Sequence, residues 1–144
     1  MTVSRARKVG LGILSVALVV LAVAAWRLAP LLTGPALPEG ATRLNIVTAG
    51  PNLTFGCATA LLAPVRVASS GDDAVLASVE SGNTVRVVWP SGFAAWRIDG
   101  RAVIADPWGS IVGREGDVLD SLGGGLGADD AFVICPFGIV TTPG

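Results

Sequence analysis

Apolar residues follow two different patterns along this chain, and these patterns divide it into a short N-terminal segment and a longer remainder. Residues 9–26 carry no charged side chain. From residue 43 onward, short apolar runs alternate with groups of Gly, Pro, Asn, Asp and Ser. An apolar run without a polar face predicts a membrane-type helix, whereas short runs between turn residues predict β-strands.

A β-hairpin is the clearest element of the second pattern. Residues 94–98 and 101–105 alternate in polarity on either side of an Asp-Gly pair. Asp-Gly between two such runs is the strongest short-range hairpin signal, because both turn residues need positive φ. A two-residue turn pairs Trp96 with Val103. We expect the face that carries these two residues and Ile98 to point into the core.

The other predicted strands share the pattern of a short run bounded by turn residues. They are residues 43–48, 54–62, 65–69, 74–80, 84–89, 111–114, 118–122 and 131–135, of which 54–62 also fits a short helix. This spacing favours antiparallel sheets over parallel βαβ units. The predicted fold class is an N-terminal transmembrane helix followed by an all-β domain. A small antiparallel β-barrel, with an OB-like barrel as one form, is the expected architecture, and a sandwich is the alternative.

The N-terminal apolar segment fits a membrane span. A helix over residues 9–26 would be roughly 27 Å long, close to the thickness of the hydrocarbon core of a bilayer. Arg5, Arg7 and Lys8 precede the segment and Arg27 follows it. This asymmetry predicts a cytoplasmic N-terminus and an extracytoplasmic domain. Small residues near the end of the run also fit the cleavage site of a signal peptide, which is the alternative interpretation.

Composition changes along the chain in a way that suggests four parts. These are a basic cytoplasmic tail (residues 1–8), a transmembrane anchor or signal peptide (9–32), a Pro/Gly linker (33–42) and an extracytoplasmic domain (43–144). The linker is expected to be an extended spacer that holds the domain off the membrane. After residue 27, six basic residues minus eleven acidic residues give a net charge of −5. An acidic domain argues against nucleic acid as a partner.

The residue types available limit the chemistry of the external domain. Cys57 and Cys135 are the only cysteines, and their extracytoplasmic position predicts a disulfide worth roughly 4 kcal/mol. The chain has no His, and its single lysine is Lys8. Hydrolases that use Ser-His-Asp or Ser-Lys are therefore excluded there. No metal site is expected from two thiols without imidazole, and no cofactor is expected.

The candidate contact residues share an expected position in turns or flexible loops. They are Trp108, Gly123, Gly124, Gly125, Asp129 and Asp130. The glycine run is expected to be a flexible hairpin loop. The loop over residues 123–130 and Trp108 are expected to contact an envelope protein or glycan, and a membrane surface is the alternative for Trp108. The predicted function is a membrane-tethered, non-catalytic interaction module. The alternative is a small carboxylate-dependent hydrolase that acts on cell-envelope material, since carboxylates are the remaining acid/base groups.

One series of short motifs carries a family resemblance. It consists of residues 88–94 (VWPSGFA), 99–100 (DG), 114–117 (REGD) and 122–125 (LGGG). The series resembles a recurrent domain in uncharacterised exported or single-pass membrane proteins of high-GC Gram-positive bacteria, and the likeness covers about the last 60 residues. The resemblance implies a small β-barrel outside the membrane. It implies no catalytic residue and no ligand.

Overall fold

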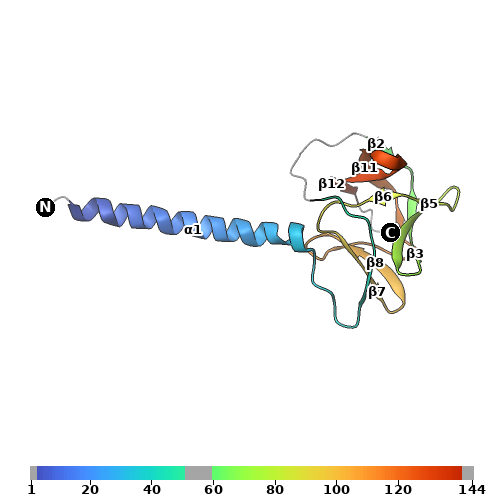
Figure 1. Ribbon diagram of the computed structural model, residues 1–144, viewed down its shortest axis with the longest axis horizontal. Helices are drawn as coiled ribbons and strands as arrows, with labels where there is room; N and C mark the ends of the chain where they lie inside the picture. The colour runs from blue at the N-terminus through green and yellow to red at the C-terminus, as the bar shows by residue number, and fades with distance from the viewer. Residues whose placement is uncertain (1–2, 51–59, 141–144) are drawn as a thin grey trace.

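A long helix leads into a β domain (Figure 1) in the computed structural model, which describes residues 3–50 and 60–140. The helix is α1 (Val3–Thr33). The strands are β1 (Thr42–Leu44), β2 (Ala60–Leu62), β3 (Val65–Ser70), β4 (Asp73–Ser78), β5 (Thr84–Val85), β6 (Val87–Val88), β7 (Ala94–Ile98), β8 (Arg101–Ala105), β9 (Ile111–Arg114), β10 (Val118–Leu119), β11 (Ser121–Leu126) and β12 (Phe132–Val140). A short 3₁₀ turn, η1 (Ala128–Asp130), joins β11 to β12.

Helix α1 projects away from the β domain as a single rod (Figure 1). Its segment Ser15–Thr33 has a mean hydropathy of 2.1 and none of it is buried. By length and composition this helix can cross a membrane, and a signal sequence near an N-terminus has the same properties. The predicted apolar helix is therefore confirmed, while retention or cleavage of the segment stays a prediction.

The strands form three four-stranded sheets, in the orders β1-β7-β8-β9, β10-β3-β4-β5 and β2-β11-β12-β6. Every pair within them is antiparallel except β6 with β12, which is parallel. The prediction of an all-β domain after the helix is confirmed. The described strands pair within three sheets, and isolated bridges link Asn45 to Asp73 and Thr48 to Trp89. These pairings do not close into a ring in the described part of the chain.

The predicted hairpin is confirmed in both its bounds and its register. β7 and β8 coincide with the two expected runs, and Trp96 lies opposite Val103. Asp99 and Gly100 have φ values of 50° and 78°. Both residues therefore adopt the left-handed conformation that a type I′ turn requires.

The prediction that the Trp96 face of this hairpin points into the main core is wrong. That core contains Ala95, Ala102 and Ile104, which lie on the opposite face from Trp96 and pack with residues of the other two sheets. The small side chains of Ala95 and Ala102 let the sheets approach closely. Trp96 and Val103 are buried as well, but in a second, smaller cluster. Both faces of the hairpin are thus covered.

Two expected strands are divided, and one expected loop is a strand. The run over residues 84–89 breaks at Arg86 into β5 and β6, which join different sheets. The run over residues 118–122 splits into β10 and β11, and β11 continues through the glycines to Leu126. The glycine run is therefore not a flexible hairpin loop. It lies between β2 and β12, where backbone-only residues allow close packing of neighbouring strands.

Candidate functional site

The C-terminal end of α1 is bound directly to the β domain. Gly34, with φ 68°, donates its N–H to the carbonyl of Pro30 at 2.8 Å and ends the helix in the usual left-handed way. The Ser91 hydroxyl donates to the carbonyl of Leu31 at 2.7 Å. A helix leaves its last carbonyls without intrahelical partners. One of these carbonyls is satisfied by a side chain from the turn that precedes β7.

Gly92 allows this contact because it has no side chain. A Cβ at this position would lie 2.7 Å from the carbonyl oxygen of Pro30 and 3.0 Å from the Cα of Leu31. Its φ of 85° also disfavours any other residue. The helix end and the turn at Ser91 and Gly92 therefore pack backbone against backbone. The two parts of the chain meet at a close-packed joint.

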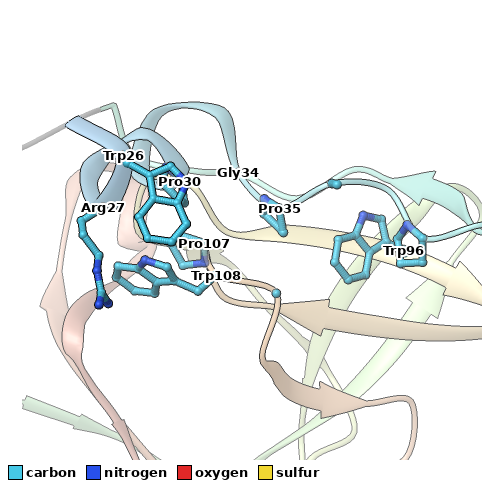
Figure 2. A pocket seen from close by; sticks show the side chains of 11 residues that line it. Trp26, Arg27, Pro30, Gly34, Pro35, Trp96, Pro107 and Trp108 are labelled. Carbon is cyan, nitrogen blue, oxygen red and sulfur yellow. The ribbon is translucent and has the colours of Figure 1, made fainter. Parts of the chain in front are cut away.

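An open cavity of about 520 Å³ lies beside this joint (Figure 2). Its lining comes from the helix end, the linker, the turn between β8 and β9, and one residue of β7. These residues are Trp26, Arg27, Pro30, Gly34, Pro35, Ala36, Pro38, Trp96, Pro107, Trp108 and Gly109. The walls are thus mainly indole and proline rings, and Arg27 provides the charge.

The linker is not the extended spacer that was expected. Pro35 and Pro38 line the same cavity as Trp96, and Ala41 packs against the smaller core cluster that contains Trp96. Rigid proline rings present apolar surface at little cost in conformational entropy. The linker therefore covers the outer face of the β7–β8 hairpin, which explains why that face is buried.

Trp108 is held in place by a well-bonded turn. The Asp106 carboxylate accepts the N–H of Trp108 at 2.9 Å and that of Ser110 at 2.8 Å. Gly109 donates its N–H to the Asp106 carbonyl at 3.0 Å, which closes a four-residue β-turn. The Trp108 side chain stays 60% exposed. Its indole lies near Trp26 and Pro107 at one end of the cavity (Figure 2).

Trp96 forms the other end of the cavity and carries an unusual polar group. The residue is only 3% exposed, and its indole Nε1 finds no hydrogen-bond partner in the described part of the chain. A buried donor without a partner typically lowers stability by about 1–3 kcal/mol.

We expect Trp96→Phe to leave the free energy of unfolding within about 1 kcal/mol of the wild-type value. Phenylalanine loses some buried area but removes the unpaired donor, so the two effects oppose each other. Urea unfolding followed by far-UV circular dichroism would measure the change. A loss well above 2 kcal/mol would show that Nε1 is bonded in solution.

The structure separates Trp108 from the other predicted contact residues. Trp108 lies beside the helix end, whereas Gly123, Gly124 and Gly125 belong to β11, and none of the three lines the cavity. Gly124 is buried. It is therefore a packing residue.

The remaining two candidates lie beyond β11. Asp129 and Asp130 are exposed residues of η1 and both have positive φ, at 58° and 56°. The Arg86 guanidinium donates to the Asp129 carbonyl at 3.3 Å.

Several acidic side chains of the described turns have structural partners. Glu115 accepts the Ser69 hydroxyl at 3.0 Å and the N–H of Ala102 at 2.8 Å, which links β3 to β8. Asp117 accepts the N–H of Arg114 at 2.8 Å within its own turn. No group of three His, Cys, Asp or Glu suited to a metal ion occurs among the described residues. The bridging role of Glu115 was not predicted, since its partners are distant in sequence.

The predicted disulfide lies partly outside the described residues. Cys135 is a half-buried residue of β12, but Cys57 belongs to the segment that the structure does not describe. Its pairing with Cys135 stays a prediction.

The joint itself was missed by sequence reasoning. Leu31 and Ser91 are 60 residues apart, and nothing in the Pro-Ser-Gly sequence at residues 90–92 points to a contact with the helix. Comparison with known proteins finds no matching family model, curated protein or solved structure. The family resemblance from the motif series stays a prediction, and function must be inferred from the geometry.

Proposed function

We propose that this protein is a single-pass, membrane-tethered module whose extracytoplasmic β domain binds another component of the cell envelope and does not catalyse a reaction. The observation that carries this proposal is the joint between Leu31 and Ser91, which attaches an apolar helix of spanning length directly to the β domain. The basic residues before the apolar segment favour a cytoplasmic N-terminus. The partner is an envelope protein or glycan rather than a nucleic acid, because the region after residue 27 is acidic.

A binding role fits the described carboxylates better than catalysis does. Glu115 and Asp117 are engaged with backbone N–H groups, which is the use that turns ordinarily make of acidic residues. A glycosidase needs two carboxyl groups facing one substrate bond. Asp73 is bonded to the Asn45 side chain at 3.0 Å, so it too has a structural partner.

The contact surface proposed for the envelope partner is the end of the domain formed by Leu126, Asp129 and Asp130. Leu126 is 79% exposed, and each aspartate has a positive φ that costs of order 1 kcal/mol or more in a non-glycine residue. Backbone strain of this kind is enriched at functional sites. An exposed apolar side chain beside two exposed carboxylates suits a partner with both apolar and hydrogen-bonding groups.

Affinity purification of the full chain from envelope extract would test this assignment. The double substitution Asp129→Ala/Asp130→Ala should abolish recovery of the specific partner. Asp99→Ala is the matched control, because Asp99 is also exposed and has a φ of 50°, but lies at the β7–β8 turn. Equal recovery with both variants would remove the surface from the proposal. Turnover of cell-wall fragments that one Asp or Glu substitution abolishes would establish the hydrolase instead.

The proposed topology has a separate test. External protease should degrade the β domain in intact cells, because the domain lies outside. Protection until lysis would contradict the topology, and N-terminal sequencing of the mature protein would distinguish an anchor from a cleaved signal peptide.

A further inference from the structure

The tryptophans of this chain divide into two buried and two exposed side chains. Trp89 and Trp96 belong to the core, whereas Trp26 is 74% exposed and Trp108 is 60% exposed. Trp26 comes from α1 and Trp108 from the turn between β8 and β9, yet both line the cavity beside the joint. Figure 2 shows their indoles gathered at one end of the cavity with Arg27 beside them. Two exposed indoles from separate elements thus share one surface.

We propose that Trp26, Arg27, Arg43 and Trp108 form a lipid-contact surface that seats the β domain on anionic phospholipids of the outer leaflet. The inference rests on the proposed single-pass topology, and it assigns Trp108 to the membrane rather than to the envelope partner.

The height of the domain above the bilayer follows from the helix. Tryptophan favours the interface between hydrocarbon and water, so Trp26 marks that level in a spanning helix. From Trp26 to the last helical residue, Thr33, the helix rises roughly 10 Å. The headgroup region extends for about half to three quarters of that distance on each side of the hydrocarbon core. The joint at Leu31 and Ser91 therefore holds the domain at the headgroup surface.

Charge is distributed so that this face of an acidic domain suits an anionic surface. Arg27 lines the cavity that contains Trp108, and its guanidinium carbon lies 5.9 Å from the centroid of the Trp26 ring. Arg43 lines a second cavity of about 340 Å³ that also includes Leu32 and Thr33 of the helix end. No acidic residue lines either of these two cavities in the described structure. Guanidinium groups bind phosphate oxygens in paired hydrogen bonds.

Three contacts fix the orientation of this surface relative to the helix. The Ser91 hydroxyl holds the Leu31 carbonyl, and Gly92 packs against the backbone of Pro30. The Asp106 carboxylate fixes the turn that carries Trp108. Because Trp26 and Trp108 belong to one close-packed unit, inserting the helix brings Trp108 to the same interface.

Fluorescence quenching of the full chain in vesicles tests the proposal. The Trp26→Phe variant is reconstituted into phosphatidylcholine–phosphatidylglycerol vesicles whose acyl chains are brominated near the carbonyl end. In this variant Trp108 is the exposed indole, while Trp89 and Trp96 are shielded by burial. We expect the bromolipid to remove the Trp108 contribution to the emission. The double variant Trp26→Phe/Trp108→Phe should show no such loss, and a Leu126→Trp substitution added to it should remain unquenched.

Each further outcome distinguishes this inference from the topology on which it rests. The Trp108→Phe variant keeps Trp26, so its quenching reports insertion of the helix. Quenching of Trp108→Phe without quenching of Trp26→Phe would overturn the lipid-contact surface and keep the anchor. Loss of quenching in both variants would overturn both proposals. Equal quenching of Trp26→Phe in vesicles of phosphatidylcholine alone would overturn the role assigned to Arg27 and Arg43.

Discussion

Gly124→Ala should destabilise the β domain by about 3 kcal/mol or more. A Cβ at this position would clash with the carbonyl oxygen of Val133 and lie 2.5 Å from a ring carbon of Phe132. The oxygen belongs to the backbone of β12, so relief requires the two strands to separate. A domain of this size has a total stability of the order of 5–15 kcal/mol. Urea unfolding of the variant should therefore show a markedly lower midpoint.

Gly50→Ala is the matched control for Gly124→Ala. Gly50 is exposed, its φ is not positive, and an added Cβ meets nothing within 4 Å among the described residues. We expect its midpoint to stay close to that of the wild type. A similar small effect at Gly124 would mean that β11 and β12 are not packed as described.

Gly92→Ala should weaken the joint between helix and domain by about 1–3 kcal/mol beyond the cost of its backbone conformation. The added Cβ would lie 2.7 Å from the Pro30 carbonyl oxygen, and the Ser91 hydrogen bond to Leu31 would be displaced with it. We expect limited proteolysis of the detergent-solubilised chain to cut faster between residues 34 and 41. The β domain should remain folded, because its main core does not include the joint.

Gly100→Ala is the control for Gly92→Ala. It tests the effect of placing alanine in a left-handed backbone conformation without the close contact to the helix. Gly100 has a φ of 78°, close to the 85° of Gly92, but an added Cβ there meets nothing within 4 Å. Both variants incur the left-handed cost of about 1–2 kcal/mol. Faster cleavage of the linker should occur in Gly92→Ala alone. If Gly100→Ala had the same effect on cleavage, the joint would not depend on the close contact.

Elements determined by local sequence were predictable, and the β7–β8 hairpin is the clearest case. Asp99 and Gly100 specify the turn by their own conformational preferences, so the pairing of Trp96 with Val103 followed directly. The end of the helix is less local. Pro30 alone would suggest that the helix stops before it, yet α1 continues past Pro30 to Thr33 and ends at Gly34.

Features that depend on distant contacts could not be predicted in the same way. Alternation assigns Trp96 and Ile104 to opposite faces of the hairpin, but both faces are apolar, and only the position of the other sheets makes the Ile104 face the main core. The glycine run suggested a flexible loop because glycine gains much backbone entropy when unfolded. Packing of Gly124 against Phe132 outweighs that tendency. The Ser91–Leu31 bond joins segments with no shared pattern.

The close-packed joint also limits the region of space around the membrane anchor that the β domain can occupy. A domain on a flexible chain samples a region whose radius grows with the square root of tether length, which sets its effective concentration at a distant target. Attachment through Ser91 and Gly92 instead fixes the position and the orientation of the β domain relative to the helix. The domain then stays at one height above the membrane. If the helix spans the bilayer as proposed, partners must arrive at that height, by lateral diffusion within the membrane or from a fixed layer next to it. Encounter is then governed by surface density rather than by concentration in the surrounding solution.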